Sequence, residues 1–148
     1  MTMDSIIEKK RLFKTLANSI ILLFLVNFFA VKFYWYYFIW YFDMSMHFFG
    51  GFCAGLVSIW LLSFLYSSFK LTFNLIIKIV LGVLVFGILW EVFEILVNNI
   101  TVQNSFNTLD TISDIFFDLV GGLFAILYFF FYFLKKIIQN TESKLQLP

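Results

Sequence analysis

The fold is decided by long apolar stretches such as residues 75–97, LIIKIVLGVLVFGILWEVFEILV. A helix needs about 20 apolar residues to cross the hydrocarbon core of a bilayer, and this stretch supplies that length. Three further stretches of the same kind cover about residues 12–30, 44–66 and 112–134. The sequence therefore predicts an all-α polytopic membrane protein: a bundle of four transmembrane helices that forms one integral membrane domain over residues 1–148.

The composition excludes most other classes of protein. Of the 148 residues, 62% are hydrophobic and 13% are charged, and the mean hydropathy is +0.95. A soluble domain is about half apolar and about a quarter charged, so a water-soluble monomer and a disordered chain are both excluded. The net charge of +1 gives no basis for nucleic-acid binding, and the single Cys53 cannot form an internal disulfide.

Basic residues predict how the spans are oriented. With four spans both termini share one side of the membrane, and nine of the ten basic residues fall on that side: Lys9, Lys10, Arg11, Lys14, Lys70, Lys78, Lys135, Lys136 and Lys144. Only Lys32 falls on the other side. The positive-inside rule therefore predicts cytoplasmic N- and C-termini in a multi-pass plasma-membrane protein. The first apolar run is too long for a signal-peptide core, so we expect it to be a retained span.

Two segments are predicted on the outer side. Residues 33–42, FYWYYFIWYF, are either an extension of the first helix or a segment in the membrane interface, where Trp and Tyr are favoured. The outer loop is predicted over residues 98–111, and it contains the glycosylation pattern Asn99-Ile100-Thr101.

The acidic residues are concentrated in the outer halves of the spans. Six of the nine acids fall there together with the only histidine: Asp43, His47, Glu91, Glu94, Asp110, Asp114 and Asp118. Their spacing is helical, because Asp43 and His47 are four residues apart, as are successive members of the Asp110–Asp118 series. An ionised side chain in a transmembrane helix costs about 2.5–3.5 kcal/mol, so we expect these stripes to converge inside the bundle.

Such a cluster predicts a divalent-metal site. Carboxylates this close cannot all be ionised unless a cation lies among them; otherwise some share protons. Carboxylates with one imidazole suit Mg, Mn, Zn or Fe, and Ca is also compatible. We predict Asp43, His47, Glu91, Asp110 and Asp114 as metal ligands. Glu94, Asp118 and His47 are the candidates for a catalytic base or a supporting group.

Plainer interpretations exist for some of these residues. Asp43 and Asp110 can cap the N-termini of their helices, and His47 can be a buried side chain with satisfied hydrogen bonds. Gly51, Gly121 and their small neighbours can serve close helix packing alone. Capping does not explain Glu91 and Glu94, which lie near a helix C-terminus, where acids are disfavoured.

The motifs together resemble a known group of membrane proteins. These are Asp43-x-x-x-His47 before a glycine-containing helix, Trp90-Glu91-x-x-Glu94, and Asp110-Thr111-x-x-Asp114. In this order they are similar to the YjdF-like small bacterial inner-membrane proteins and, more distantly, to the VanZ-like family. The resemblance implies a bacterial inner-membrane protein with a site at these motifs, and VanZ-like proteins are associated with low-level glycopeptide resistance. Glu94 and the lack of an Arg before Asp110 depart from the VanZ-like pattern.

Several functions fit this pattern. The first is a metal-dependent hydrolase or transferase that acts on a lipid head group or a lipid-linked envelope intermediate, with membrane lipids as its partners. The alternative is a proton- or cation-coupled binding or transport protein, which with four spans requires a homo-oligomer. A VanZ-like resistance factor without catalysis and a structural accessory subunit are the remaining classes. The inner halves of the spans contain no acid, which favours a one-sided site over a through-path.

Overall fold

The computed structural model describes residues 3–65, 72–101 and 107–145, which are helical except at 33–34, 39–41, 72 and 107 and contain no strand. Its elements are α1 (Met3–Lys32), α2 (Trp35–Phe38), α3 (Phe42–Leu65), α4 (Phe73–Thr101) and α5 (Thr108–Leu145). The prediction of four spans is confirmed, because α1, α3, α4 and α5 are each long and apolar enough to cross a membrane.

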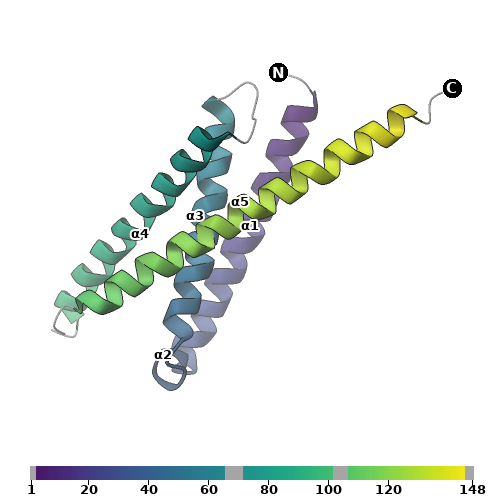
Figure 1. The fold of residues 1–148 in the computed structure, drawn as a ribbon. Coiled ribbons are helices and arrows are strands. Elements are labelled where there is room, and N and C mark those ends of the chain that lie inside the picture. The colour runs from purple at the N-terminus through teal and green to yellow at the C-terminus, as the bar shows by residue number, and fades with distance from the viewer. Residues whose placement is uncertain (1–2, 66–71, 102–106, 146–148) are drawn as a thin grey trace.

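Helix α3 is the centre of the bundle, and α1, α4 and α5 all pack against it (Figure 1). Its contact with α5 is the most extensive, and α5 crosses it obliquely. The starts of α1 and α4 and the ends of α3 and α5 lie at one end of the bundle. The opposite end, called the α2 end below, carries α2, the end of α4 and the start of α5. The first and last helices therefore place both termini on one side, as an even number of spans requires.

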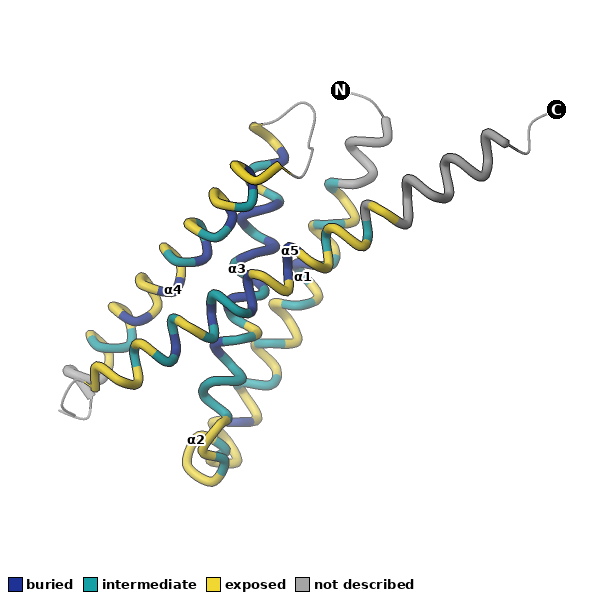
Figure 2. Tube along the Cα trace, in the orientation of Figure 1, coloured by how far each residue is buried: buried dark blue, intermediate teal, exposed yellow. Residues whose placement is uncertain are grey.

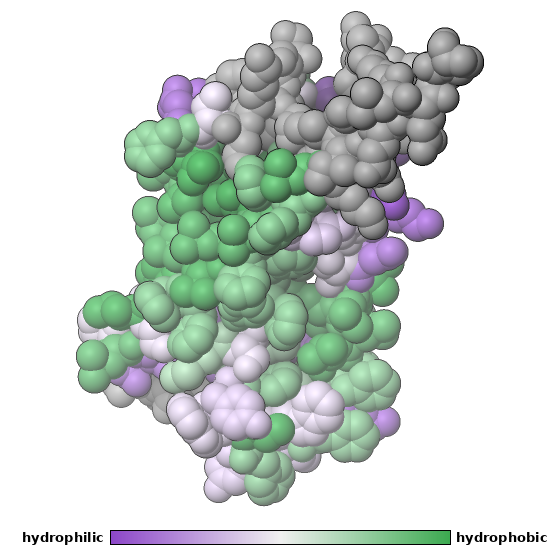
Figure 3. All heavy atoms as spheres, turned by 45° about the vertical axis from the view of Figure 1, so that its right-hand side comes forward, coloured by the Kyte–Doolittle hydropathy of each residue, from purple (hydrophilic) through white to green (hydrophobic). Residues whose placement is uncertain are grey.

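Most of the buried residues lie on α3, α4 and α5, and α1 adds Leu16 and Ala30 (Figure 2). Helix α1 is exposed along most of its span, and apolar side chains cover the middle of the molecule (Figure 3). Leu22 and Phe24, for example, are 63% and 68% exposed. In water such a surface would be unfavourable, so it is the surface that contacts lipid.

Glycines allow α3 and α5 to approach closely. A Cβ atom at Gly51 would overlap the backbone carbonyl of Asp118, and one at Gly121 would overlap the backbone oxygen of Phe48. The predicted use of small residues for close helix contact is therefore confirmed at this crossing. The crossing matters for the site, because it holds the middle of α5 against the first turns of α3.

The segments on the outer side differ in detail from the sequence-based prediction. Residues 33–42 do not extend α1: the helix ends at Lys32, Tyr34 adopts a left-handed conformation with φ 57°, and α2 follows. The 98–111 loop is shorter than predicted, because α4 continues to Thr101 and α5 begins at Thr108. The glycosylation pattern at 99–101 thus falls on the last turn of α4, while 102–106 and Lys70 lie outside the described residues.

Candidate metal centre

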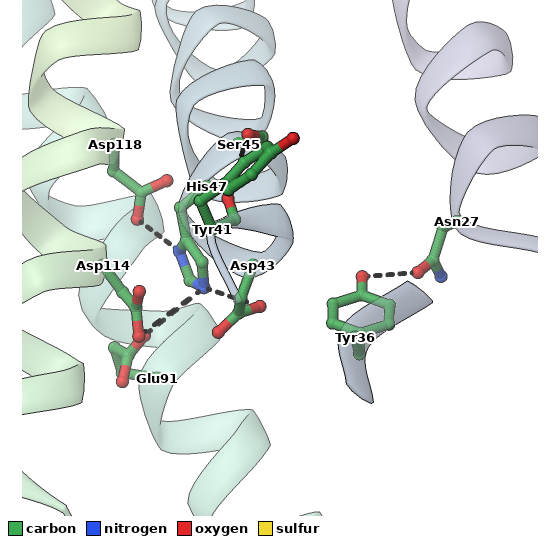
Figure 4. A network of polar contacts seen from close by, with 9 residues as sticks. All are labelled: Asn27, Tyr36, Tyr41, Asp43, Ser45, His47, Glu91, Asp114 and Asp118. Carbon is green, nitrogen blue, oxygen red and sulfur yellow. Dashed lines mark hydrogen bonds and ion pairs between the residues drawn. The ribbon is translucent and has the colours of Figure 1, made fainter. Parts of the chain in front are cut away.

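The site is built around the imidazole of His47, which lies in the second turn of α3 and is 5% exposed. Its Nδ1 is 3.4 Å from Oδ2 of Asp118 on α5, in a buried hydrogen bond that the ring N–H donates (Figure 4). A neutral ring with its proton on Nδ1 would present the lone pair of Nε2 to the other side. This is the tautomer that binds a metal through Nε2.

Three carboxylates surround Nε2, one from each of the three packed helices. Oδ1 of Asp43 lies 4.0 Å from Nε2, Oε1 of Glu91 4.0 Å, and Oδ2 of Asp114 3.9 Å. These distances are too long for hydrogen bonds. They are also longer than the roughly 3.3–3.6 Å between two tetrahedral ligands at about 2.0–2.2 Å from one metal, so a shared ion would draw these oxygens closer to the ring.

The Glu91 carboxylate gives independent support for a bound cation. Glu91 is 6% exposed, and its Oε1 is a buried oxygen that has no hydrogen-bond partner among the residues that the structure describes. A buried acceptor without a partner costs about 1–3 kcal/mol, and more if it is charged. The same oxygen is the one that faces Nε2 of His47. A metal ion at this point would supply the missing partner.

The predicted ligands do not all enter the site. Two overlapping groups have ligand atoms within 4.8 Å of one another: Asp43, His47 and Asp114, and His47, Glu91 and Glu94. Glu94 is half-buried and belongs to the second group. Asp110 belongs to neither group and is exposed in the first turn of α5, so its predicted role as a ligand stays a prediction. Asp118 is the partner of Nδ1 instead of Nε2.

The charges of this cluster are not balanced by its own residues. The ion pairs that the structure shows here all use His47 as the cationic partner. Four carboxylates each lie within 4.0 Å of a nitrogen of this one ring. A protonated imidazole would neutralise one of them and leave the others uncompensated. Helices α3, α4 and α5 all have the length and apolarity of membrane spans at this level, which makes the imbalance costly.

Gly87, which the sequence analysis did not select, leaves space for the carboxylate of Asp118. A Cβ atom at Gly87 of α4 would lie 2.8 Å from Oδ2 of Asp118, the oxygen that accepts the hydrogen bond from His47. A Cβ atom at Gly50 of α3 would lie 3.7 Å from the other carboxylate oxygen. The spacing could have identified Gly87, because it lies one helical turn before Glu91.

Tyr36 of α2 is the second residue that sequence reasoning missed. Its hydroxyl donates a hydrogen bond of 2.7 Å to Oδ1 of Asn27 on α1 (Figure 4). Its ring packs edge-on against that of Phe42, with 4.9 Å between the ring centroids. Burial raises the pKa of Tyr36 to about 12, and the charges of Asp43 and Glu94 add to this rise. The phenol therefore stays neutral at the edge of the site. Within the aromatic run nothing distinguished this tyrosine from its neighbours.

The comparisons identify the family. A family model described as "Predicted membrane protein (DUF2238)" matches residues 5–135, and the chain belongs to this family. The YjdF-like resemblance is thereby confirmed, since the YjdF family is this one. The match covers the four spans and every residue of the site. No curated protein and no solved structure matches the chain.

Proposed function

We propose that this chain is a divalent-metal-dependent membrane enzyme, a hydrolase or transferase that acts on a lipid head group or a lipid-linked envelope intermediate. The observation that supports a bound metal is the arrangement of carboxylates around Nε2 of His47. Three carboxylate oxygens from three helices lie 3.9–4.0 Å from it, and one of them is a buried acceptor without a partner.

The donor set favours a borderline metal ion. Imidazole suits Zn and the later transition metals, whereas carboxylates suit Mg, Ca and Mn, so one nitrogen with three or four oxygens favours Zn²⁺ or Mn²⁺. We assign His47, Asp43, Glu91 and Asp114 as ligands. Asp118 acts as a positioning residue, because a carboxylate on the second ring nitrogen fixes the tautomer and orientation of a metal-binding histidine.

Glu94 is our candidate for the general base. It lies in one group with His47 and Glu91 but is only half-buried, so it stays within reach of both the metal and water. A bound divalent ion activates water and polarises an ester or phosphoryl oxygen. A carboxylate beside it can then accept the proton of the attacking water. His47 is a weaker candidate as a base, because both of its ring nitrogens already have a role.

The depth of the centre supports a membrane-bound substrate. His47 lies five residues into the α3 span, and Glu91 and Asp114 each lie six residues from the ends of theirs. At 1.5 Å per residue, all three are about 7–9 Å below the span ends. With the termini in the cytoplasm, as the basic residues predict, the centre belongs to the outer leaflet of a bacterial inner membrane. Lipid head groups and lipid-linked intermediates are present at that level.

The rest of the core supports a one-sided site over a transport path. Toward the end opposite α2, the described core is an apolar cluster of Ile59, Leu75, Ile79 and Ile126. The buried polar groups on that side are the hydroxyls of Ser58 and Ser63, and Ser63 hydrogen-bonds within its own helix. A cation carrier would need ligands along this half as well.

The test combines metal content with lipid turnover. Detergent-purified full-length protein is expected to contain about one Zn or Mn per chain by elemental analysis. Reconstituted with that metal, it should release a head group or acyl chain from lipid vesicles. Glu91→Gln should lower the metal content, and Glu94→Gln should lower turnover more than metal content. Lys10→Gln, which removes an exposed charge near the start of α1, is the control. Bound metal with no turnover of any lipid would contradict the proposed enzymatic activity. Absence of metal would contradict the proposed function as a whole.

A further inference from the structure

We propose that Asp110 is an entry residue for the cation, which reaches the buried centre from the α2 end along carboxylates of increasing depth. This inference rests on the proposed metal function and adds the side from which the cation enters the site. It also gives a role to a carboxylate that lies near the centre without belonging to it.

The carboxylates form a graded series. Asp110 is exposed in the first turn of α5, the side chain of Asp43 is 37% exposed, and Glu94 is half-buried. The side chains of Glu91 and Asp114 are only 8% and 5% exposed. Along α5, each step from Asp110 to Asp114 and then to Asp118 descends about 6 Å. The series ends at the buried Glu91 oxygen without a partner, so it leads to a point that requires a cation.

Asp110 is placed to attract a cation and not to hold it. It is outside both groups of ligand atoms, yet its charge acts on the carboxylates of Asp43, Glu94 and Asp114. Charges of one sign at the mouth of a low-dielectric site raise the local concentration of the opposite ion and its association rate.

The opposite end of the bundle has the reverse character. Its core is apolar, and Lys9, Lys10, Arg11 and Lys14 lie in the first turns of α1 at that end. A cation approaching there meets like charge and then an apolar core. Both features favour entry from the α2 end. The same acidic mouth disfavours anionic ligands, so the centre should load with the free metal ion and not with an anionic metal chelate.

The test is the rate of Zn²⁺ binding to metal-free full-length protein in detergent, measured by stopped flow at low and high salt. Asp110→Asn should lower the association rate constant about three- to tenfold at low salt and leave the dissociation rate unchanged. The difference should shrink at high salt, where the Debye length is only a few ångströms. Asn107→Asp is the matched variant: it adds a charge one turn away and keeps the side-chain oxygen that accepts the backbone N–H of Leu109. It should accelerate binding.

The outcomes separate this inference from the function on which it rests. An unchanged association rate in Asp110→Asn, with normal binding by the wild type, would overturn the entry role alone. A faster dissociation with unchanged association would also overturn it, and would make Asp110 a ligand. If the wild type binds no Zn²⁺ at all, the proposed function fails first.

Discussion

The two halves of this bundle are built from the same helices, but one buries ionisable side chains and the other buries aliphatic side chains. In the half near α2, the buried side chains include His47, Glu91, Asp114 and Asp118. In the other half, the buried side chains form the apolar cluster of Ile59, Leu75, Ile79 and Ile126. Helices α3, α4 and α5 contribute to both sets, so the difference does not come from the fold. The close crossing at Gly51 and Gly121 lies between the two.

On the function proposed above, the apolar half stabilises the protein and the polar half holds the metal. Packed aliphatic side chains give the apolar half many favourable van der Waals contacts. Buried carboxylates cost free energy in a membrane unless they are paired, and here four of them share one imidazole. The cost of burying these carboxylates is the reason we propose ligand binding, and not stability, as the role of the polar half.

The largest effect should come from breaking the crossing that joins the halves. In Gly121→Leu the new side chain would overlap the backbone of Phe48, which a rotamer change cannot relieve. We expect loss of folded protein in detergent, measured by size-exclusion chromatography, and loss of metal with it. Leu123→Ala, at an exposed position on α5, is the control and should fold normally.

Truncation in the apolar half should affect stability alone. Ile79 is fully buried in the apolar cluster, and Ile79→Ala leaves a cavity there. Large-to-small core substitutions cost about 2–5 kcal/mol, and we expect about 2 here because lipid provides little hydrophobic driving force. The free energy of unfolding in mixed micelles measures this. Metal stoichiometry should stay unchanged, and a parallel loss of metal would contradict the independence of the halves.

Removing the charge of Asp118 should lower metal affinity and leave stability nearly unchanged. Asp118→Asn keeps the shape of the side chain but weakens the hold on Nδ1 of His47. Loss of such a supporting group costs about 10–100-fold in metal affinity. Competition with a chelator of known affinity gives the value. A variant that binds metal as tightly as the wild type would show that Asp118 does not position the ring.

A pair of glycines on α4 gives a finer comparison. Gly87→Ala places a methyl group 2.8 Å from Oδ2 of Asp118, and Gly82→Ala places one against the Ser58 hydroxyl in the other half. We expect metal affinity to fall about threefold to tenfold in the first variant, less than on removing the charge. The second variant should lower stability without this effect. Equal affinities in the two variants would mean that Asp118 adapts freely.

The smallest effect concerns the tether between α2 and α1. Tyr36→Phe removes the hydrogen bond to Asn27, worth about 0.5–1.5 kcal/mol, and exposure places it at the lower end. In the folded protein the pKa of Tyr36 is raised from 10.0 to about 12, so the folded state binds this proton more tightly. Stability should therefore fall as pH rises from about 10 to 12. This fall should be smaller in Tyr36→Phe, and identical pH profiles would contradict it.

Much of this arrangement was predictable from sequence. Four apolar runs specify four helices, because only helices satisfy the backbone of a separate span in lipid. The helical spacing of Asp43 with His47, and of Asp114 with Asp118, predicted that these side chains lie at one level of the bundle, and the structure brings them together around His47. Gly51 and Gly121 were found because close helix approach requires small residues.

Other features depend on how the helices are rotated about their axes. Asp110 is part of the same stripe as Asp114, yet it remains exposed because it precedes the region where α5 reaches α3. Asp118 contacts Nδ1 and not Nε2, which spacing along one helix cannot specify. After α1 ends at Lys32, Tyr34 adopts a left-handed conformation. Residues other than glycine rarely adopt it, so the sequence did not predict the end of the helix at this point.

The most direct test of the central claim is the coordination of the bound metal. X-ray absorption spectroscopy at the edge of the metal found in the purified protein would count its nitrogen and oxygen neighbours. Our account predicts a shell of one imidazole nitrogen with carboxylate oxygens at about 2.0–2.2 Å, and loss of the imidazole signal in His47→Gln. An all-oxygen shell in the wild type, or a spectrum unchanged by His47→Gln, would contradict the account.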